Sequence, residues 1–482
     1  MAIALPIGFC FAWGFLLLGA IWPPRQVSSS EHGFRLFLTL GFGIGLFSVV
    51  FFVTRLAGIT HLLAADSFVT LVLATVYAWR RNRITHPLLI ESRSQDFNLP
   101  VWLRHALTAS FVLSTLVACG SALLQTRAHP HGYGWDAFSI WNLHARFLFL
   151  GGDHWREGFS ALIPWSHPDY PLLTPAAIAH FWSYLGHDDP RVPAALSITF
   201  ACATLGLLVS SLMHLRERHA AMLAGIALAS TPFFVEQATA QYADIPLAFF
   251  CLASMVCLHL GLRNSGENSA HHPTNWSILA GVALGFAAWT KNEGQLFVAA
   301  FLLAQVASAL SAGRRPSSCD SAQKNRLPIA ALLIALAPML LLIGWFKHTI
   351  APPGDLFSSG SAMLQKIASP GRYWIILRWY GKEFFRFGNW WIVPGTVLLV
   401  VLYLALRSGT RRHDPALRSS ILTLALTLAG YFAIYVITPY DIYWHLRFSL
   451  NRLFLQLWPS TIFLFFLFVG GQSRSLSPDK SI

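Results

Sequence analysis

The sequence predicts an all-α polytopic membrane protein, and three observations support this fold class. Hydrophobic residue types make up 55% of the 482 residues and charged types only 11%, less than half of the roughly 25% that is typical of soluble domains. The mean hydropathy is +0.53, and apolar runs of about 20 residues, the length that crosses a bilayer, recur along the chain. This composition excludes a disordered chain, a disulfide-stapled scaffold and a nucleic-acid-binding globule, in spite of the net charge of +13.

About 13 apolar runs are candidate transmembrane helices, since each is close to the length that a bilayer-crossing helix needs. The predicted spans are 2–21, 34–54, 62–79, 105–124, 191–213, 219–234, 243–262, 276–290, 293–311, 328–347, 391–407, 420–437 and 453–470. Residues 1–104 then form a unit of three N-terminal helices, and residues 105–470 form the membrane core. The polar tail 471–482 is predicted to be disordered on the cytoplasmic side.

Basic residues orient these spans, because Lys and Arg in short loops stay in the cytoplasm. They cluster between the third and fourth, fifth and sixth, ninth and tenth, and eleventh and twelfth spans. Thirteen spans place all four clusters on one side. The long segments 125–190 and 348–390 then lie outside, together with more than half of the acidic residues. We therefore expect an integral membrane protein whose chemically rich side is the periplasmic or extracellular face. A bacterial inner membrane is the default location, since the sequence shows no eukaryotic retention signal.

Each outer segment has its own predicted structure. The apolar stretches 137–150 and 171–185 are expected to be helices along the membrane surface, because a crossing at 171–185 would invert the downstream charge pattern. Segment 348–390 mixes Lys and Arg with Trp and Tyr, which is typical of an interfacial segment near anionic headgroups.

Small and sulfur-containing residues in the apolar runs predict packing rather than chemistry. Five of the six cysteines lie in these runs and none forms a Cys-x-x-Cys pair, so they are expected to be buried hydrophobes. The glycine pairs Gly41/Gly45 and Gly281/Gly285 have the spacing that lets two helices approach closely.

The first outer motif with candidate chemistry surrounds Asp136, in Gly-Trp-Asp-Ala-Phe-Ser at the start of the predicted helix 137–150. A carboxylate held among aromatic residues at the lipid–water boundary can act as a general base. Aspartate is also a favoured helix N-cap. The sequence alone leaves both roles open for Asp136.

Two further outer segments carry acids. His167 and Asp169 lie in a proline-bounded turn and are candidate metal ligands or phosphate-side contacts, the alternative being a solvated loop. Glu236 and Asp244 lie in a short outer loop, and Asp244 leads directly into a predicted span. An acid at that position is either a helix N-cap or a functional group, because it is costly next to a bilayer.

Some basic residues lie on the predicted outer side, although Lys and Arg in short loops usually stay in the cytoplasm. These outer basic residues are candidate phosphate contacts. Lys291 and Glu293 lie on a tight predicted turn. They form either an interfacial ion pair or a contact for a phosphate or a substrate. His445, Arg447 and Arg452 precede the last predicted span. An Arg fork suits two phosphate oxygens, and the alternative is snorkelling to lipid headgroups.

Together these motifs resemble the GT-C superfamily of integral-membrane glycosyltransferases, near the protein O-mannosyltransferase and aminoarabinose-transferase branch. The resemblance covers roughly residues 105–300, with weaker support to 470. It is carried by Gly-Trp-Asp136, His167-Pro-Asp-Tyr-Pro171, Tyr-Ala-Asp244-Ile-Pro and Thr-Lys-Asn-Glu293-Gly.

The resemblance implies a role for each candidate site residue. Asp136 would be the catalytic carboxylate. Three acids and one histidine would assist acceptor or metal binding. They are Glu236, Asp244, Asp169 and His167. The lipid-phosphate and donor contacts would come from Lys291, Glu293, His445, Arg447 and Arg452.

The predicted function is therefore transfer of a sugar from a polyprenyl-phosphate-linked donor to a protein, lipid or glycan acceptor at the outer face, with inversion. A divalent cation is the one cofactor that is compatible with this predicted function. Membrane lipids are expected as further partners. The alternative is a membrane transporter or lipid flippase, which would line the bilayer midplane with polar residues. Asp66 is the lone acid inside a predicted span, which argues against ion coupling. A noncatalytic assembly subunit is the third reading.

Overall fold

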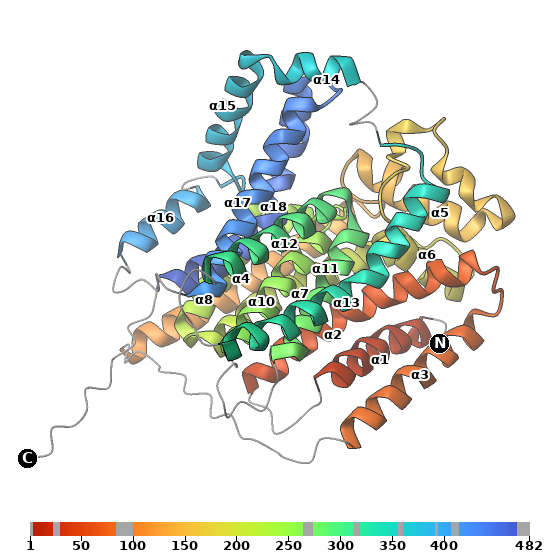
Figure 1. Cartoon of the computed structure of the whole chain (residues 1–482), viewed down its shortest axis with the longest axis horizontal. Coiled ribbons are helices and arrows are strands. Elements are labelled where there is room, and N and C mark those ends of the chain that lie inside the picture. Colours follow the sequence, from red (N-terminus) through yellow and green to blue (C-terminus); the bar gives the residue numbers. More distant parts are fainter. Residues whose placement is uncertain are drawn as a thin grey trace, which may run out of the picture.

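The computed structural model describes residues 3–22, 29–82, 100–263, 273–312, 319–354, 360–390, 394–405 and 414–469. These residues form helices and turns and contain no strand (Figure 1). The predicted all-α class is confirmed.

A helix coincides with every predicted span. These helices are α1 (Ala4–Ile21), α2 (Ser29–Leu56), α3 (Leu62–Asn82), α4 (Val101–Ala128), α7 (Arg191–Leu215), α8 (Arg218–Ala229), α10 (Asp244–Arg263), α11 (Pro273–Thr290), α12 (Asn292–Ala312), α13 (Cys319–Thr349), α16 (Gly395–Ala405), α17 (Pro415–Ile437) and α18 (Ile442–Phe468). Within the described ranges, 10 helices are long and apolar enough to cross a membrane. Helices α8, α11 and α16 are shorter or less apolar.

The last span begins earlier than the sequence predicts. Helix α18 starts at Ile442 rather than at residue 453, and the Asp441 carboxylate accepts the backbone N–H of Trp444 at its N-terminus. Polar residues in its first three turns lower the local hydropathy, so the apolar run by itself predicts a later start. His445, Arg447 and Arg452 therefore lie on a continuous helix and not in a loop.

Several topological predictions concern residues outside the described ranges. They include the basic segments within 83–99, 313–318 and 406–413 and the tail 471–482. The orientation relative to the cytoplasm accordingly stays a prediction.

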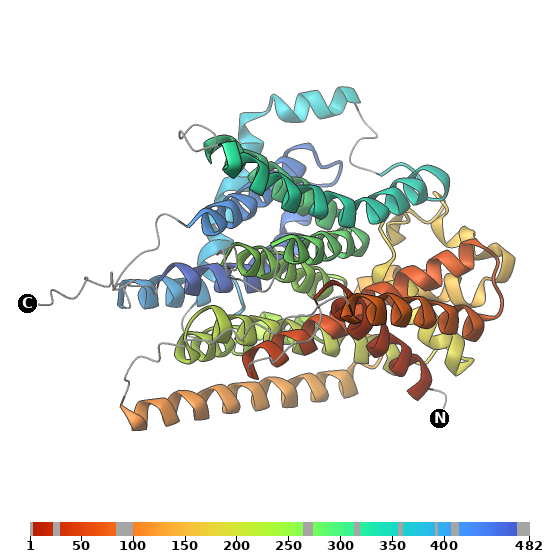
Figure 2. The same ribbon diagram turned by 60° about the horizontal axis from the view of Figure 1, so that its bottom comes forward.

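Helix α10 lies at the centre of the bundle, where it packs against α7, α11 and α18. Within its membrane-crossing window, 94% of the residues are buried. Helices α3 and α4 have mostly exposed apolar side chains, and Figure 2 shows α4 (orange) along the edge of the molecule. An outer surface of this kind is expected where helices face lipid.

Close packing at the predicted glycines is confirmed. A Cβ on Gly281 would stand 2.4 Å from the carbonyl oxygen of Leu332 on α13, and one on Gly285 would meet Met339. The two helices share an extensive interface because these glycines let the backbones approach.

The burial predicted for the cysteines is only partly correct. Cys10, Cys251 and Cys257 are buried as expected, whereas Cys119 and Cys202 are exposed on the outside of the bundle. Their apolar runs belong to helix faces that look outward, so apolar context alone does not predict burial.

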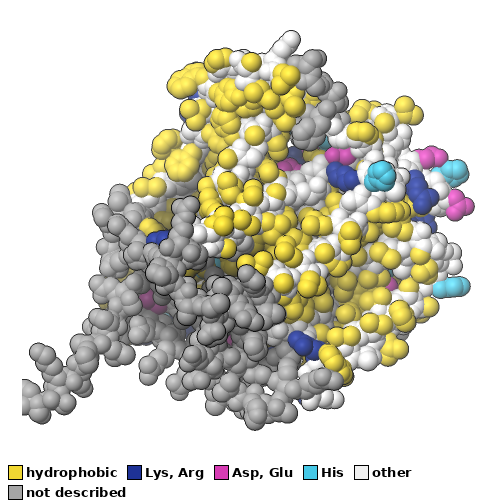
Figure 3. Space-filling view, in the orientation of Figure 1, with side chains coloured by type: hydrophobic (Ala, Val, Ile, Leu, Met, Phe, Trp, Pro, Cys, Tyr) yellow, Lys and Arg dark blue, Asp and Glu magenta, His cyan; other side chains and the backbone are white. Residues whose placement is uncertain are grey.

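The first outer segment forms a cap of short helices at one end of the bundle, on the right of Figure 1. It comprises η1 (Ala137–Trp141), α5 (Asn142–Leu150), η2 (Gly152–Phe159), η3 (Pro164–Ser166) and α6 (Leu173–Leu185). Helices predicted over 137–150 and 171–185 are thus present. Helix α6 is largely buried, because α2, α5 and α7 cover it. Charged side chains gather toward this end in Figure 3.

The second outer segment contributes α14 (Gly360–Ile367) and α15 (Pro370–Arg386), and α9 (Pro232–Gln237) lies in a shorter connection. Lys366 donates to the carbonyl oxygen of Thr438 (2.8 Å), and Arg372 donates to that of Val436 (3.0 Å). These cations bind the free carbonyl groups at the C-terminus of α17, which fixes α14 and α15 beside that helix.

A buried polar cluster joins α3 to α6. The Nε2 atom of His180 lies 3.0 Å from Asp66 Oδ2, which also accepts the hydroxyl of Tyr184 at 2.6 Å. The other ring nitrogen of His180 bonds the carbonyl oxygen of Phe47 on α2 (3.0 Å). Asp66 is therefore a structural residue inside the protein, since Asp66 and His180 have no exposed surface.

Replacing Asp66 by alanine is expected to lower the free energy of unfolding by about 3–5 kcal/mol, because a buried pair that loses one partner leaves the other unsatisfied. Asp66→Asn should cost clearly less, since its amide can still bond His180 and Tyr184. Thermal unfolding of the purified variants in detergent measures both changes. Equal losses for alanine and asparagine would contradict the view that hydrogen bonding holds this cluster.

Candidate active site

Five charged side chains from separate parts of the chain alternate in sign at one end of the bundle. We call Asp136, Arg452, Asp244, Lys291 and Glu293 the central charge network. All five are residues that the sequence predicted for the site. The structure brings them together from the turn before η1, from α10, α12 and α18, and from the turn between α11 and α12.

The turn before η1 positions Asp136. Gly132 and Gly134 have φ values of +92° and +97°, which favour glycine. A Cβ on Gly134 would stand 2.6 Å from the hydroxyl of Tyr242. The following turns form a π-helix, a rare element that is frequent at functional sites.

The Asp136 carboxylate does not cap its helix, because it makes no hydrogen bond to the backbone of the next residues. Its Oδ2 atom instead accepts Nη1 of Arg452 at 2.6 Å. The Asp136 side chain remains 24% exposed. Of the two roles that the sequence left open, the geometry contradicts the N-cap.

Arg452 bridges two carboxylates. Besides its bond to Asp136, its Nε donates to Asp244 Oδ2 at 2.9 Å. Its guanidinium carbon also lies 4.5 Å from the ring centroid of Tyr242, in a cation–π contact. The guanidinium thereby fixes the position of Asp136 relative to the buried Asp244.

Asp244 anchors the network from inside the protein. Its side chain is 0% exposed, and its Oδ1 accepts both Lys291 Nζ (3.0 Å) and Gln456 Nε2 (2.6 Å). A group without exposed surface cannot contact an acceptor directly. Asp244 is therefore placed to position Arg452 and Lys291.

Lys291 is enclosed by acids rather than open to a ligand. Its ammonium group lies 3.0 Å from Asp244 and 2.8 Å from Glu293, and the side chain is buried. Burial acts to lower the pKa of Lys291, but the carboxylates of Asp244 and Glu293 outweigh it and raise that pKa. Lys291 was predicted to hold a lipid phosphate. In the structure, Asp244 and Glu293 already pair with its charge.

A second polar cluster adjoins the network. Asp169 Oδ2 accepts Asn292 Nδ2 (2.7 Å) and Lys347 Nζ (3.2 Å), and Lys347 also donates to Asn292 Oδ1 (2.8 Å). Asn292 follows Lys291 directly, so the two clusters share one turn. The ring of His167 stacks on Tyr170, with centroids 4.7 Å apart.

Three predicted site residues have other surroundings. Glu236 accepts Asn389 Nδ2 at 3.2 Å. The Nδ1 atom of His445 lies 2.8 Å from the hydroxyl of Thr438. Arg447 is exposed on the side of α18 that faces α15.

The described side chains do not form a ready-made cage for a divalent cation. Among the described residues, no three His, Cys, Asp or Glu side chains converge as ligands. The acids Asp136 and Asp244 have the Arg452 guanidinium between them. A cation there would have to displace that guanidinium.

Sequence reasoning missed four residues of these clusters, namely Tyr242, Asn292, Lys347 and Gln456. Two of them carry a recognisable signal. Lys347 is a cation at the outer end of a predicted span, and Gln456 is an amide four residues after Arg452 in an apolar helix.

The fold and these clusters define an integral-membrane protein with a charged site at the ends of its helices. Residues 176–349 match the family model described as Dolichyl-phosphate-mannose-protein mannosyltransferase, which belongs to the GT-C superfamily. No curated protein and no solved structure matches the chain.

The match agrees with the GT-C resemblance of the sequence. It spans little more than a third of the chain. It contains Asp244, Lys291, Glu293 and Lys347. Asp136 and Arg452 lie outside it and join the site through the fold.

Asp244→Ala is expected to abolish most sugar transfer and to destabilise the protein by about 3–5 kcal/mol, because it leaves Arg452 and Lys291 without their buried partner. Asp188→Ala is the matched control. It removes an acid of the outer segment whose pair with Arg146 is solvent-exposed, and such pairs contribute about 0–1 kcal/mol. Thermal unfolding and a transfer assay compare the two, and similar stability for both variants would contradict the anchoring role of Asp244.

Proposed function

We propose that this protein transfers one sugar from a polyprenyl-phosphate carrier to an acceptor at the periplasmic face of a bacterial inner membrane, with Asp136 as the general base. The observation that carries the proposal is the state of the Asp136 carboxylate. It is partly exposed, it does not cap its helix, and one of its oxygens is held by Arg452.

In the proposed reaction, an acceptor hydroxyl attacks the anomeric carbon of the sugar. Asp136 takes the hydroxyl proton as the new carbon–oxygen bond forms. The bond between the anomeric carbon and the phosphate oxygen breaks, and the electron pair leaves with the polyprenyl phosphate. A single displacement of this kind inverts the anomeric configuration.

The contacts favour a division of labour among the predicted residues. Arg452 orients Asp136, and Asp244 and Glu293 hold the buried cations in place. The Asp169, Asn292 and Lys347 cluster offers donors and a carboxylate at a partly exposed position, a set that suits sugar or acceptor hydroxyl groups.

The position of the charges favours a transferase over a transporter. Asp244 is the first residue of α10, and Lys291 lies between α11 and α12. Glu293 lies in the first turn of α12, and Lys347 lies in the last turn of α13. A substrate site at helix ends suits a reaction at the membrane surface. Transporter sites instead lie near the bilayer midplane.

Asp136→Asn is expected to lower the transfer rate by about 10²–10⁴-fold, the usual contribution of a general base. The amide keeps the shape and one oxygen for Arg452, so folding should be retained. The test incubates purified protein with a lipid extract from the source membrane and follows the conversion of glycosylated carrier to polyprenyl phosphate by mass spectrometry.

The control for this test is thermal unfolding, which should give nearly equal midpoints for the two proteins. Turnover of Asp136→Asn within a few-fold of the wild type would remove Asp136 from the role of base. Absence of any carrier turnover by the wild type would count against the transferase itself.

A further inference from the structure

The phenol hydroxyl of Tyr170 is an unused hydrogen-bonding group inside the candidate active site. Tyr170 is partly exposed, and its hydroxyl has no hydrogen bond to any residue that the structure describes. The hydroxyls of Tyr184, Tyr431 and Tyr435 differ, because each of them bonds another side chain. Since a phenol in a protein interior usually finds such a partner, the Tyr170 hydroxyl is available to a ligand.

A rigid turn presents this phenol. His167 has a left-handed backbone with a φ of +47°, and its carbonyl oxygen accepts the backbone N–H of Tyr170 at 2.9 Å. Pro168 and Pro171 restrict the chain on either side. The Tyr170 ring also stacks on Trp141, with centroids 5.7 Å apart and planes 26° apart. The ring is therefore fixed before a ligand binds, which lowers the entropic cost of binding.

Tyr170 lies where the central charge network meets the second polar cluster. Trp141, on which it stacks, follows Asp136 by five residues, and Asp169 precedes Tyr170 directly. On the other side, Lys291 Nζ is 5.9 Å from the centroid of the Tyr170 ring. A ligand that contacts the phenol is therefore close to the proposed general base.

The charges around the phenol favour a neutral ligand. Burial raises the pKa of Tyr170, and the carboxylates of Glu293, Asp169 and Asp136 raise it further, against the lowering effect of Arg452. The hydroxyl therefore keeps its proton and remains a donor. Three of these four charged groups are acids, so a phosphate at this position would be repelled, whereas a hydroxyl group would not.

Two unpaired polar atoms lie in the same surroundings. Trp141 Nε1 and Glu293 Oε2 are buried and have no hydrogen-bond partner within the described part of the chain. Buried atoms of this kind are rare, and they mark places where a polar ligand or water completes the hydrogen bonding. Donors and acceptors occur together here, and a ligand with several hydroxyl groups matches both, because each hydroxyl can donate and accept.

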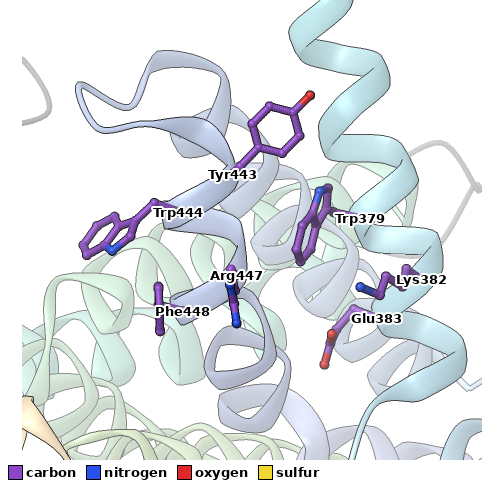
Figure 4. Close-up of a pocket in the computed structure, with 7 residues that line it drawn as sticks. All are labelled: Trp379, Lys382, Glu383, Tyr443, Trp444, Arg447 and Phe448. Atoms are coloured by element: carbon purple, nitrogen blue, oxygen red, sulfur yellow. The ribbon is translucent and has the colours of Figure 1, made fainter.

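The groove between α15 and α18 is a separate surface (Figure 4). Lys382, Glu383 and Arg447 line it together with four aromatic side chains, and neither Tyr170 nor a residue of the central charge network is among them. The α15–α18 groove presents two cations, whereas most charged groups that act on Tyr170 are carboxylates. The two surfaces therefore suit different ligands.

We propose that Tyr170 is a specificity-determining residue whose hydroxyl donates a hydrogen bond to a hydroxyl group of the sugar that is transferred. The sugar hydroxyl can donate in turn to a neighbouring carboxylate. This inference rests on the proposed function and names the part of the substrate that Tyr170 recognises. A sugar that lacks this hydroxyl leaves the phenol unpaired, and the site discriminates against it for that reason.

The first test replaces Tyr170 by phenylalanine, which keeps the ring stack and removes only the hydroxyl. With the glycosylated carriers of a lipid extract from the source membrane, kcat/KM for carrier turnover should fall about tenfold, as expected for the loss of one hydrogen bond to the substrate. The midpoint of thermal unfolding should not fall, because the hydroxyl has no partner among the described residues.

Tyr373→Phe is the matched control, because it makes the same chemical change on α15. The Tyr373 hydroxyl bonds the carbonyl oxygen of Ile367 at an exposed position. This variant should turn over the carrier at the rate of the wild type.

The second test uses monodeoxy forms of the sugar that the first assay identifies, each linked to farnesyl phosphate. One of them should be about tenfold poorer than the parent sugar for the wild type. Tyr170→Phe should use that deoxy sugar and the parent sugar at nearly equal rates, because the contact is already absent from the variant.

Three results would overturn the role of Tyr170 while leaving the transferase intact. They are unchanged turnover by Tyr170→Phe, a lowered unfolding midpoint that accounts for its loss of activity, and discrimination among the deoxy sugars equal to that of the wild type. A wild type that turns over no carrier contradicts the proposed function instead.

Discussion

The site depends on the Arg452 guanidinium held between Asp136 and Asp244. A buried cation is unfavourable unless acids pair with it, and a buried acid has the same requirement. Arg452 meets both requirements, because it pairs with the buried Asp244 and also with the partly exposed Asp136. Its contact with Asp244 thereby fixes the position of Asp136. The relative positions of η1, α10 and α18 are thereby fixed by one side chain.

Helix ends supply the remaining partners of this network. Asp244 and Glu293 lie in the first turns of α10 and α12, where the helix dipole favours negative charge. Lys291 lies between them in the turn. The apolar bundle can therefore hold these charges at the ends of its helices, where each has a partner of opposite sign.

Much of the fold and most of the site residues could be predicted from the sequence. The apolar runs predict the helices because the bilayer sets their length, and Asp136, Asp244, Lys291, Glu293 and Arg452 are conspicuous as outer charges. Their pairing could not be predicted, because 316 residues separate Asp136 from Arg452 and local patterns do not report such contacts. The burial of α6 and the α15–α18 groove escaped prediction for the same reason.

The most direct test of the central claim is mass spectrometry of polyprenyl-phosphate lipids from cells that express the wild type or Asp136→Asn. If the protein uses Asp136 to remove a sugar from such a carrier, one glycosylated carrier accumulates in the variant, and its mass identifies the donor sugar. Identical lipid profiles, with both proteins present in the membrane at equal levels, would contradict the claim.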